Sequence, residues 1–290
     1  MPRPVFPRER LSDFVELTKP NIVGLILITV AAGFYLGSTG EVSFVLLLHT
    51  LLGSALVAAG SNALNQILER RIDAKMHRTR RRPLPSGRLR TSESAVFAWS
   101  LGVVGVGYLA LFTNWLVALL AAATLASYVF VYTPLKGHTS LNTLVGAVPG
   151  ALPILGGWAA ARGTVDLQAW VLFVILFLWQ LPHFLALAWL YREDYARAGL
   201  RMLSVTEGAD ATFRQALLYA VALLPVSLAP SVLGTTGPIY FVGAFVLSGW
   251  LIAATGAAAL DHTPKKARKL FLATVVYLPV MLVLMMVDKV

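Results

Sequence analysis

Residues 62–83 read NALNQILERRIDAKMHRTRRRP and begin while the sequence is still inside a long apolar run. Four polar residues recur in this stretch at i, i+3, i+7 and i+11, so on an α-helix they form one polar stripe: Asn62, Asn65, Glu69 and Asp73. Two carboxylates and two amides at the end of a membrane helix are costly unless they bind something. Carboxylate and amide oxygens suit Mg²⁺, which takes one or two carboxylates together with substrate phosphates. The stripe therefore predicts a Mg²⁺ site formed by Asn65, Glu69 and Asp73, with Asn62 as a substrate contact.

Six arginines follow the stripe: Arg78, Arg80, Arg81, Arg82, Arg88 and Arg90. A guanidinium group matches phosphate or carboxylate oxygens bidentately, so a metal site beside arginines predicts a diphosphate ligand. Arg78 and Arg82 lie one helical turn apart, and we expect these two to contact the ligand. The other four are explained by the excess of positive charge on the inner side of membrane proteins.

The composition is that of an integral membrane protein: 57% of the 290 residues are hydrophobic, 13% are charged and the mean hydropathy is +0.72. The chain has no cysteine, which excludes disulfides and thiolate metal sites. A net charge of +10 is typical of nucleic-acid binders. In a membrane protein the positive-inside bias explains it, so we expect the lipid bilayer as a partner and no nucleic acid.

Apolar runs of spanning length lie at 21–39, 42–68, 94–113, 115–135, 141–161, 168–190, 212–234, 238–260 and 268–287. These runs predict an all-α membrane protein of one domain, 1–290, with about nine transmembrane helices in a bundle around a central cavity that opens to the cytoplasmic side. Arg162 and Lys289 are the only Lys or Arg residues outside the inner segments of this topology. We therefore expect a bacterial plasma membrane or an organellar inner membrane, with the active site on the cytoplasmic or matrix side.

Three segments carry the polar residues of the inner side. Residues 1–20 are expected to form a cytoplasmic amphipathic segment, since Leu11, Phe14, Val15 and Thr18 share one helical face. Residues 70–92 and 191–211 are long cytoplasmic loops. Long loops with dense polar residues are where function collects, so both are predicted to border the active site.

A second candidate site lies in WQLPHFLALAWLYREDYARAGLRMLSV, residues 179–205. On one continuous helix His183 and Asp194 share a face, so they are expected to look into the same cavity. A histidine in a membrane helix is equally well explained as a packing group. Arg192 and Arg197 add charge at the inner end and are predicted substrate contacts.

Lys136 and Asn142 flank the short inner loop between the fourth and fifth spans. A lysine there can reach a phosphate oxygen as a point charge, although it also satisfies the topology alone. Asn142, Gly146 and Gly150 follow at steps of four, which favours close helix packing over a ligand groove. We retain Lys136 and Asn142 as predicted substrate contacts.

Two long strings, NQILERRIDAKMHRTRRRPLPSG and WQLPHFLALAWLYREDYARAGLRMLSV, resemble the protohaem IX farnesyltransferases, or haem O synthases, of the UbiA-type intramembrane prenyltransferase superfamily. The resemblance covers essentially the whole chain. It implies nine helices around a cavity and acidic motifs on the second and sixth helices that hold Mg²⁺ against a prenyl diphosphate. It implies transfer of a farnesyl group from farnesyl diphosphate to a vinyl group of haem b, with addition of water.

The resemblance also implies roles for the second site. The sixth helix has Asp194 beside Glu193 and no aspartate run, which matches the haem branch and argues against a phenolic acceptor. His183 would ligate the haem iron or orient water, and Asp194 would accept a proton or pair with a cation. Haem A synthase or oxidase assembly factors are the implied protein partners. The alternatives are a prenyltransferase acting on a quinone precursor or chlorin, and a transporter of an anionic lipid or haem.

Overall fold

The computed structural model describes residues 7–290, so residues 1–6 of the expected N-terminal segment lie outside the described residues. Over that range the chain is helical apart from turns and one isolated bridge between Thr236 and Lys289. The N-terminal helix α1 (Pro7–Thr18) precedes the first span. The all-α prediction is confirmed.

Nine helical segments of the described chain are long and apolar enough to span a membrane, which confirms the predicted number. They are α2 (Pro20–Gly37), α3 (Phe44–Asp73), α4 (Thr91–Phe112), the combined span Trp115–Leu135, α7 (Asn142–Arg162), α8 (Leu167–Leu190), α11 (Gly208–Val232), α12 (Pro238–Leu260) and α13 (Pro264–Val287). The combined span consists of α5 (Trp115–Ala126), a π-helical turn η1 (Ser127–Tyr132) and α6 (Thr133–Leu135). Two short helices, α9 (Arg192–Ala198) and α10 (Leu203–Thr206), lie between α8 and α11.

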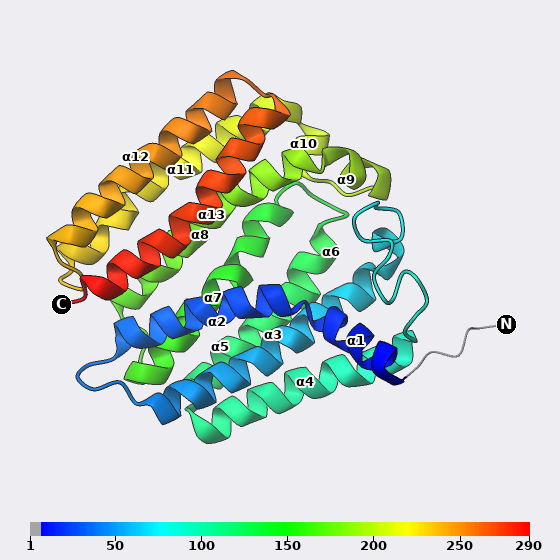
Figure 1. Cartoon of the computed structure of the whole chain (residues 1–290), viewed down its shortest axis with the longest axis horizontal. Helices are drawn as coiled ribbons and strands as arrows, with labels where there is room; N and C mark the ends of the chain where they lie inside the picture. The colour runs from blue at the N-terminus through cyan, green and yellow to red at the C-terminus, as the bar shows by residue number, and fades with distance from the viewer. Residues whose placement is uncertain (1–6) are drawn as a thin grey trace.

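One end of the bundle collects the long loops. Figure 1 shows α1, the cyan loop after α3, α9 and α10 gathered at one end, with the C-terminus at the other. We call the first of these the loop end, formed by 74–90, 136–141 and 191–207. The helix α3 extends to Asp73, five residues beyond the predicted apolar run. The polar stripe is therefore helical and reaches the loop end.

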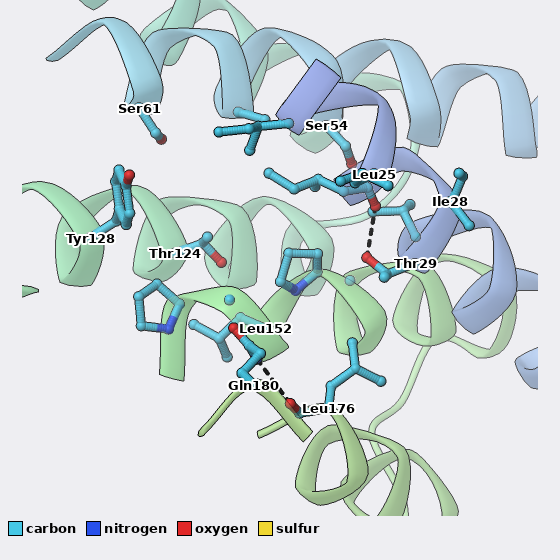
Figure 2. Close-up of a pocket in the computed structure, with 18 of the residues that line it drawn as sticks. Leu25, Ile28, Thr29, Ser54, Ser61, Thr124, Tyr128, Leu152, Leu176 and Gln180 are labelled. Carbon is cyan, nitrogen blue, oxygen red and sulfur yellow. Dashed lines mark hydrogen bonds between the residues drawn. The ribbon is translucent and has the colours of Figure 1, made fainter. Parts of the chain in front are cut away.

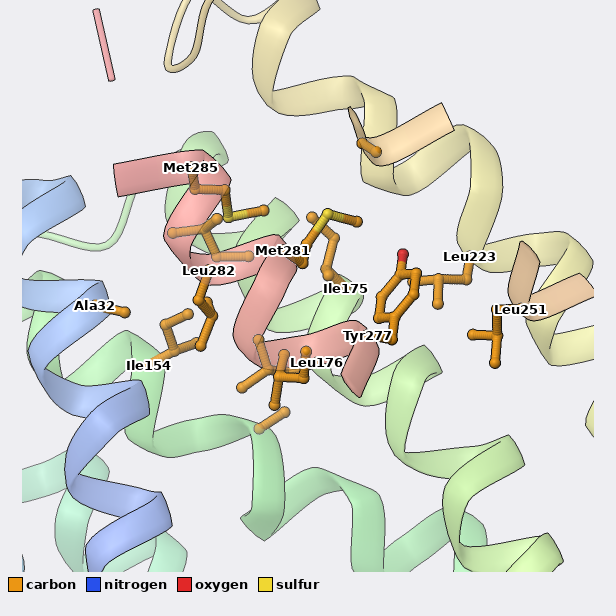
Figure 3. Packing of buried hydrophobic residues seen from close by; sticks show 14 of the residues in the cluster. Ala32, Ile154, Ile175, Leu176, Leu223, Leu251, Tyr277, Met281, Leu282 and Met285 are labelled. Carbon is orange, nitrogen blue, oxygen red and sulfur yellow. The ribbon is translucent and has the colours of Figure 1, made fainter. Parts of the chain in front are cut away.

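Two groups of helices pack around α7. In Figure 1, α8, α11, α12 and α13 lie on one side and α2, α3, α4 and α5 on the other. The backbones of α2 and α7 approach closely because a Cβ at Gly33 or Gly157 would collide with the backbone of the facing helix. Figure 3 shows Tyr277, Met281 and Met285 of α13 packed among buried residues of neighbouring helices. This packing positions α2, α7 and α13, which also contribute residues to the cavity described below.

Candidate active site

The polar stripe of α3 lies on one buried face at the loop end. Asn62, Asn65, Glu69 and Asp73 are between 1% and 7% exposed, so the stripe faces the protein interior and not lipid. Burial of charged and amide groups is favourable only when partners compensate for the lost water. The neighbouring helices supply those partners.

A cation contacts each of the three predicted metal ligands. Lys136 Nζ lies 2.7 Å from Glu69 Oε1, and an Arg82 guanidinium nitrogen lies 2.8 Å from Asp73 Oδ2. Lys19 Nζ donates to Asn65 Oδ1 at 2.9 Å. The structure therefore places Arg82 and Lys136, both predicted substrate contacts, at the stripe, where each neutralises one carboxylate.

Lys19 is a site residue that the sequence analysis missed. Its φ of 55° and ψ of 66° are left-handed, a conformation uncommon outside glycine, and Pro20 begins α2 immediately afterwards. The end of α1 is held against α3, because Gln66 Nε2 donates to Leu17 O at 2.9 Å. Burial, reinforced by Arg82 and opposed by Glu69, lowers the pKa of Lys19 to about 7. The only sequence signal was a lysine next to a proline at the start of a span.

Lys136 is held by an aromatic ring as well as by Glu69. Its Nζ lies 4.5 Å from the ring centroid of Tyr132, which belongs to the π-helical turn η1. The same turn positions Thr133, whose hydroxyl accepts from Asn65 Nδ2 at 3.2 Å and donates to Tyr128 O at 2.7 Å. Burial alone lowers the pKa of Lys136, but Tyr132 and Glu69 reverse the effect and raise it. The π-helical turn η1 thus positions the side chains that contact Lys136 and Asn65. Such turns are often found at functional sites.

The stripe fits a magnesium ion. Asp73 Oδ1 is buried without a hydrogen-bond partner, although Oδ2 of the same carboxylate is paired with Arg82. No group of three or more His, Cys, Asp or Glu side chains suited to a metal occurs in residues 7–290. Two carboxylates and one amide are nevertheless an adequate protein contribution for Mg²⁺, which completes its shell with water and phosphate oxygens.

An apolar cavity of about 470 Å³ opens beside the stripe. It lies among α2, α3, α5, η1, α7, α8 and α13, and Asn62 and Tyr132 are part of its wall. Figure 2 shows Leu25, Thr124, Tyr128, Leu152 and Gln180 around this space. A hydrocarbon chain can therefore lie in the cavity while its anionic head reaches the stripe.

The expectation that His183 and Asp194 share a cavity is wrong. The helix α8 ends at Leu190, Tyr191 interrupts the helical backbone, and α9 begins at Arg192. Helical periodicity does not continue through such a break, so Asp194 no longer follows the face of His183. His183 lines the cavity, whereas Asp194 lies at the loop end.

Asp194 binds the loop that follows the stripe. Its carboxylate oxygens accept from the backbone N–H of His77 at 3.3 Å and of Arg78 at 3.4 Å. Arg197 donates to Asp194 Oδ1 at 2.8 Å. Desolvation raises the pKa of Asp194, but these donors outweigh it and leave the pKa below its usual value. Arg197 thus contacts Asp194 and not the stripe.

The remaining predicted arginines form no hydrogen bond or ion pair with the stripe among the described residues. The Arg78 guanidinium is exposed and lies 5.1 Å from the ring centroid of Tyr191. Arg192 lies 4.5 Å above the ring of Trp189 and donates to the backbone oxygen of that residue. Arg88, which we explained by topology alone, contacts Asp13 of α1 at 2.8 Å. It therefore also braces the loop against α1.

Asn142 joins two loops. It is fully buried, and its Nδ2 donates to Thr139 O at 2.6 Å and to Arg201 O at 3.1 Å. Arg201 N donates in turn to Lys136 O at 2.9 Å. Asn142 is therefore placed to hold the segment of Lys136 and is not part of the cavity wall. Gly146 and Gly150 do line the cavity and also pack tightly against side chains, as the helix-packing interpretation predicts.

Comparison with known proteins gives a consistent assignment. Residues 26–278 match the UbiA prenyltransferase family. The chain is 45% identical over 289 residues to a protoheme IX farnesyltransferase of Solibacter usitatus, covering 96% of this chain and 99% of the relative. It is also 45% identical over 284 residues to a protoheme IX farnesyltransferase of Gloeobacter violaceus, covering 97% and 92%.

Solved structures share the fold at low sequence identity. A digeranylgeranylglyceryl phosphate synthase has a TM-score of 0.82 at 19% identity, covering 97% of this chain and 98% of that one. A UbiA homologue from Archaeoglobus fulgidus bound to GPP and Mg²⁺ has a TM-score of 0.69 at 15% identity, covering 94% and 99%. The chain belongs to the UbiA prenyltransferase family and, within it, to the protohaem IX farnesyltransferases.

Proposed function

We propose that this protein transfers the farnesyl group of farnesyl diphosphate to a vinyl group of haem b, with addition of water, and so forms haem O. The observation that carries the proposal is the buried ionic stripe of α3 beside an apolar cavity whose wall includes Asn62. Its curated relatives, 39% to 45% identical, are protoheme IX farnesyltransferases, which supports the choice of acceptor.

The stripe and its cations are suited to the diphosphate. Asn65, Glu69 and Asp73 would hold Mg²⁺, which when bound offsets the negative charge that builds on the leaving group. Lys19, Arg82 and Lys136 are already within hydrogen-bond distance of the stripe. When an anionic substrate enters, these cations can exchange carboxylate oxygens for phosphate oxygens, which frees the carboxylates for the metal.

The reaction then needs no nucleophilic side chain. The allylic C–O bond breaks and its electron pair leaves with diphosphate. The terminal vinyl carbon of haem b forms a C–C bond with the farnesyl cation, and the new cation next to the porphyrin takes up water and loses a proton. The products are haem O, diphosphate and one proton. The apolar cavity wall limits early capture by water, and the rings of Tyr128 and Trp179 are suited to stabilising a cation.

The placement in the membrane is part of the proposal. Nearly all the lysines and arginines belong to the loop end or adjoining helix ends, so we assign this end to the cytoplasmic or matrix side. Haem b and farnesyl diphosphate would reach the stripe from that side or from the bilayer. The product would pass to a haem A synthase or to oxidase assembly factors.

The test uses purified full-length protein with haem b, farnesyl diphosphate and Mg²⁺, followed by chromatographic separation of the haems. A more hydrophobic haem product is expected, and it should disappear when Mg²⁺ is chelated. Release of diphosphate without that product would show that the acceptor is wrong. A phenolic acceptor added in competition tests the quinone alternative, and binding without any turnover would favour a transporter.

A further inference from the structure

Thr274 of α13 has a hydroxyl group that lies between two partners. Its Oγ1 donates to Phe271 O at 2.6 Å and lies 2.8 Å from His183 Nδ1. A hydroxyl carries a single hydrogen. When that hydrogen is donated to Phe271 O, Thr274 Oγ1 can only accept the bond from His183. This arrangement of the hydroxyl places the ring hydrogen of His183 on Nδ1.

Thr274 is well placed to impose this arrangement. It is 0% exposed, and its own carbonyl oxygen accepts from Trp179 Nε1 at 2.8 Å. The imidazole of His183 is also stacked on Trp179, with ring centroids 5.3 Å apart, and lies 4.9 Å from the ring of Phe271. The imidazole orientation is thus held by a hydrogen bond and by two aromatic rings.

The other ring nitrogen remains available. A neutral imidazole that is protonated at Nδ1 has a lone pair at Nε2. No carboxylate contacts His183 in the described part of the chain, so this apolar setting favours the neutral ring. His183 lines the cavity, and its Nε2 forms no hydrogen bond with any described residue. A lone pair is therefore offered to whatever molecule occupies the cavity.

We infer that Thr274 is a positioning residue that holds His183 in the Nδ1–H tautomer, and that His183 Nε2 is an axial ligand of the iron of haem b. The inference rests on the proposed function, because haem b is the acceptor substrate there. Histidines that ligate metals almost always donate their second ring N–H to an acceptor, which fixes the tautomer and the ring orientation. Thr274 Oγ1 provides that acceptor. Axial ligation would hold the porphyrin in the cavity while its vinyl group reacts.

The experiment measures haem binding without turnover. Full-length protein in detergent is mixed with ferric haem b alone, without farnesyl diphosphate or Mg²⁺, and absorption and electron paramagnetic resonance spectra are recorded. We expect an imidazole-ligated spectrum for the wild type. The spectrum should lose this signature in His183→Ala and regain it when free imidazole is added.

The variants of Thr274 test the positioning role. Thr274→Val removes the acceptor and should raise the Kd for haem b about 10- to 100-fold, whereas Thr274→Ser keeps the hydroxyl and should restore tight binding. Thr255→Val is the matched control, since Thr255 is equally buried and its hydroxyl bonds only Leu251 O of its own helix, at 2.7 Å. Nitrogen-15 NMR of histidine in the wild type adds a readout that needs no Thr274 variant. A proton on Nδ1 is expected for His183.

Several results would overturn the inference. A haem spectrum that is identical in wild type and His183→Ala would show that His183 is not an axial ligand. An unchanged Kd for haem b in Thr274→Val would show that Thr274 does not position His183. A ring proton on Nε2 contradicts the tautomer. If wild-type protein still forms the farnesylated haem in these cases, the proposed function stands and only the inference fails. If wild type neither binds haem b nor forms product, the proposed function fails.

Discussion

Lys136 Nζ lies 2.7 Å from Glu69 Oε1 although the two residues are 67 positions apart in the chain. Both side chains are largely buried, at 15% and 9% exposed. The lysine therefore neutralises a carboxylate that we propose as a Mg²⁺ ligand, and under that proposal the lysine can exchange this carboxylate for a phosphate oxygen when the substrate binds. This exchange of partners makes the pair sensitive to substitution.

Lys136→Met should lower the free energy of unfolding by about 3–5 kcal/mol, because it leaves the charge of Glu69 buried and uncompensated. Thermal unfolding of the purified protein measures the change. Mg²⁺ should stabilise Lys136→Met more than wild type, since the freed carboxylate gains a partner. The control is Lys266→Met, for which the structure shows no ion pair. Equal unfolding temperatures in Lys136→Met and Lys266→Met would contradict the prediction.

Asp73→Asn should reduce kcat by about 10²-fold or more and leave the protein folded, because it removes the charge that helps to hold the metal. The substitution keeps the shape of a side chain that is 1% exposed. Turnover at saturating farnesyl diphosphate and a titration with Mg²⁺ check the effect. Wild-type activity in this variant would show that Asp73 is not a ligand of the metal.

Gly150→Ala should destabilise the protein by about 1–3 kcal/mol, because the added Cβ would collide with Gln180 Oε1. Gln180 has little freedom to move, since its Nε2 donates to Leu176 O at 3.0 Å and to Ala147 O at 3.3 Å. Gly156→Ala on the same helix is the control, since nothing lies within 4 Å of its Cβ position.

A second substitution should relieve the collision at position 150. A Gln180→Ala substitution removes the side chain that an alanine at position 150 would meet. Gly150→Ala combined with Gln180→Ala should therefore be more stable than the sum of the two single effects, as thermal unfolding of all four proteins would reveal. Strictly additive effects would show that the two positions do not interact.

Asp194→Ala should speed hydrogen exchange at the backbone amides of His77 and Arg78, which donate to its carboxylate. Because the pKa of Asp194 is depressed, its contribution to stability is present above the ordinary value of 3.8 and is lost as the pH falls through the lower folded-state pKa. The protection of these amides from exchange should therefore differ between wild type and Asp194→Asn by a constant amount above about pH 5. This difference in protection should shrink in acid. Exchange measured across pH by mass spectrometry provides the test, and a difference that grows in acid would exclude this role.

The absence of cysteine makes the orientation directly measurable. Arg80→Cys lies in the exposed loop after α3, and Thr164→Cys lies in the exposed turn between α7 and α8 at the other end of the bundle. In intact bacterial cells that express the protein, an impermeant maleimide should label position 164 and not position 80. The opposite pattern would place the site outside.

The sequence by itself determined the nine spans and the polar stripe of α3, because hydropathy and helical periodicity are local properties and α3 is unbroken from Phe44 to Asp73. Where the backbone departs from a helix, those rules fail. The break at Tyr191 takes Asp194 off the face of His183 and turns it toward the loop that carries Arg78.

The partners of the stripe were decided only by the tertiary structure. Lys19 enters the site through a left-handed backbone conformation, and Thr274 meets His183 across 91 positions of the chain. The contact of Lys19 is signalled in the sequence only by the proline that follows it, and the contact of Thr274 with His183 has no local sequence signal. Each depends on how separate helices pack, and packing brings together side chains whose spacing along the chain carries no information about their distance in space.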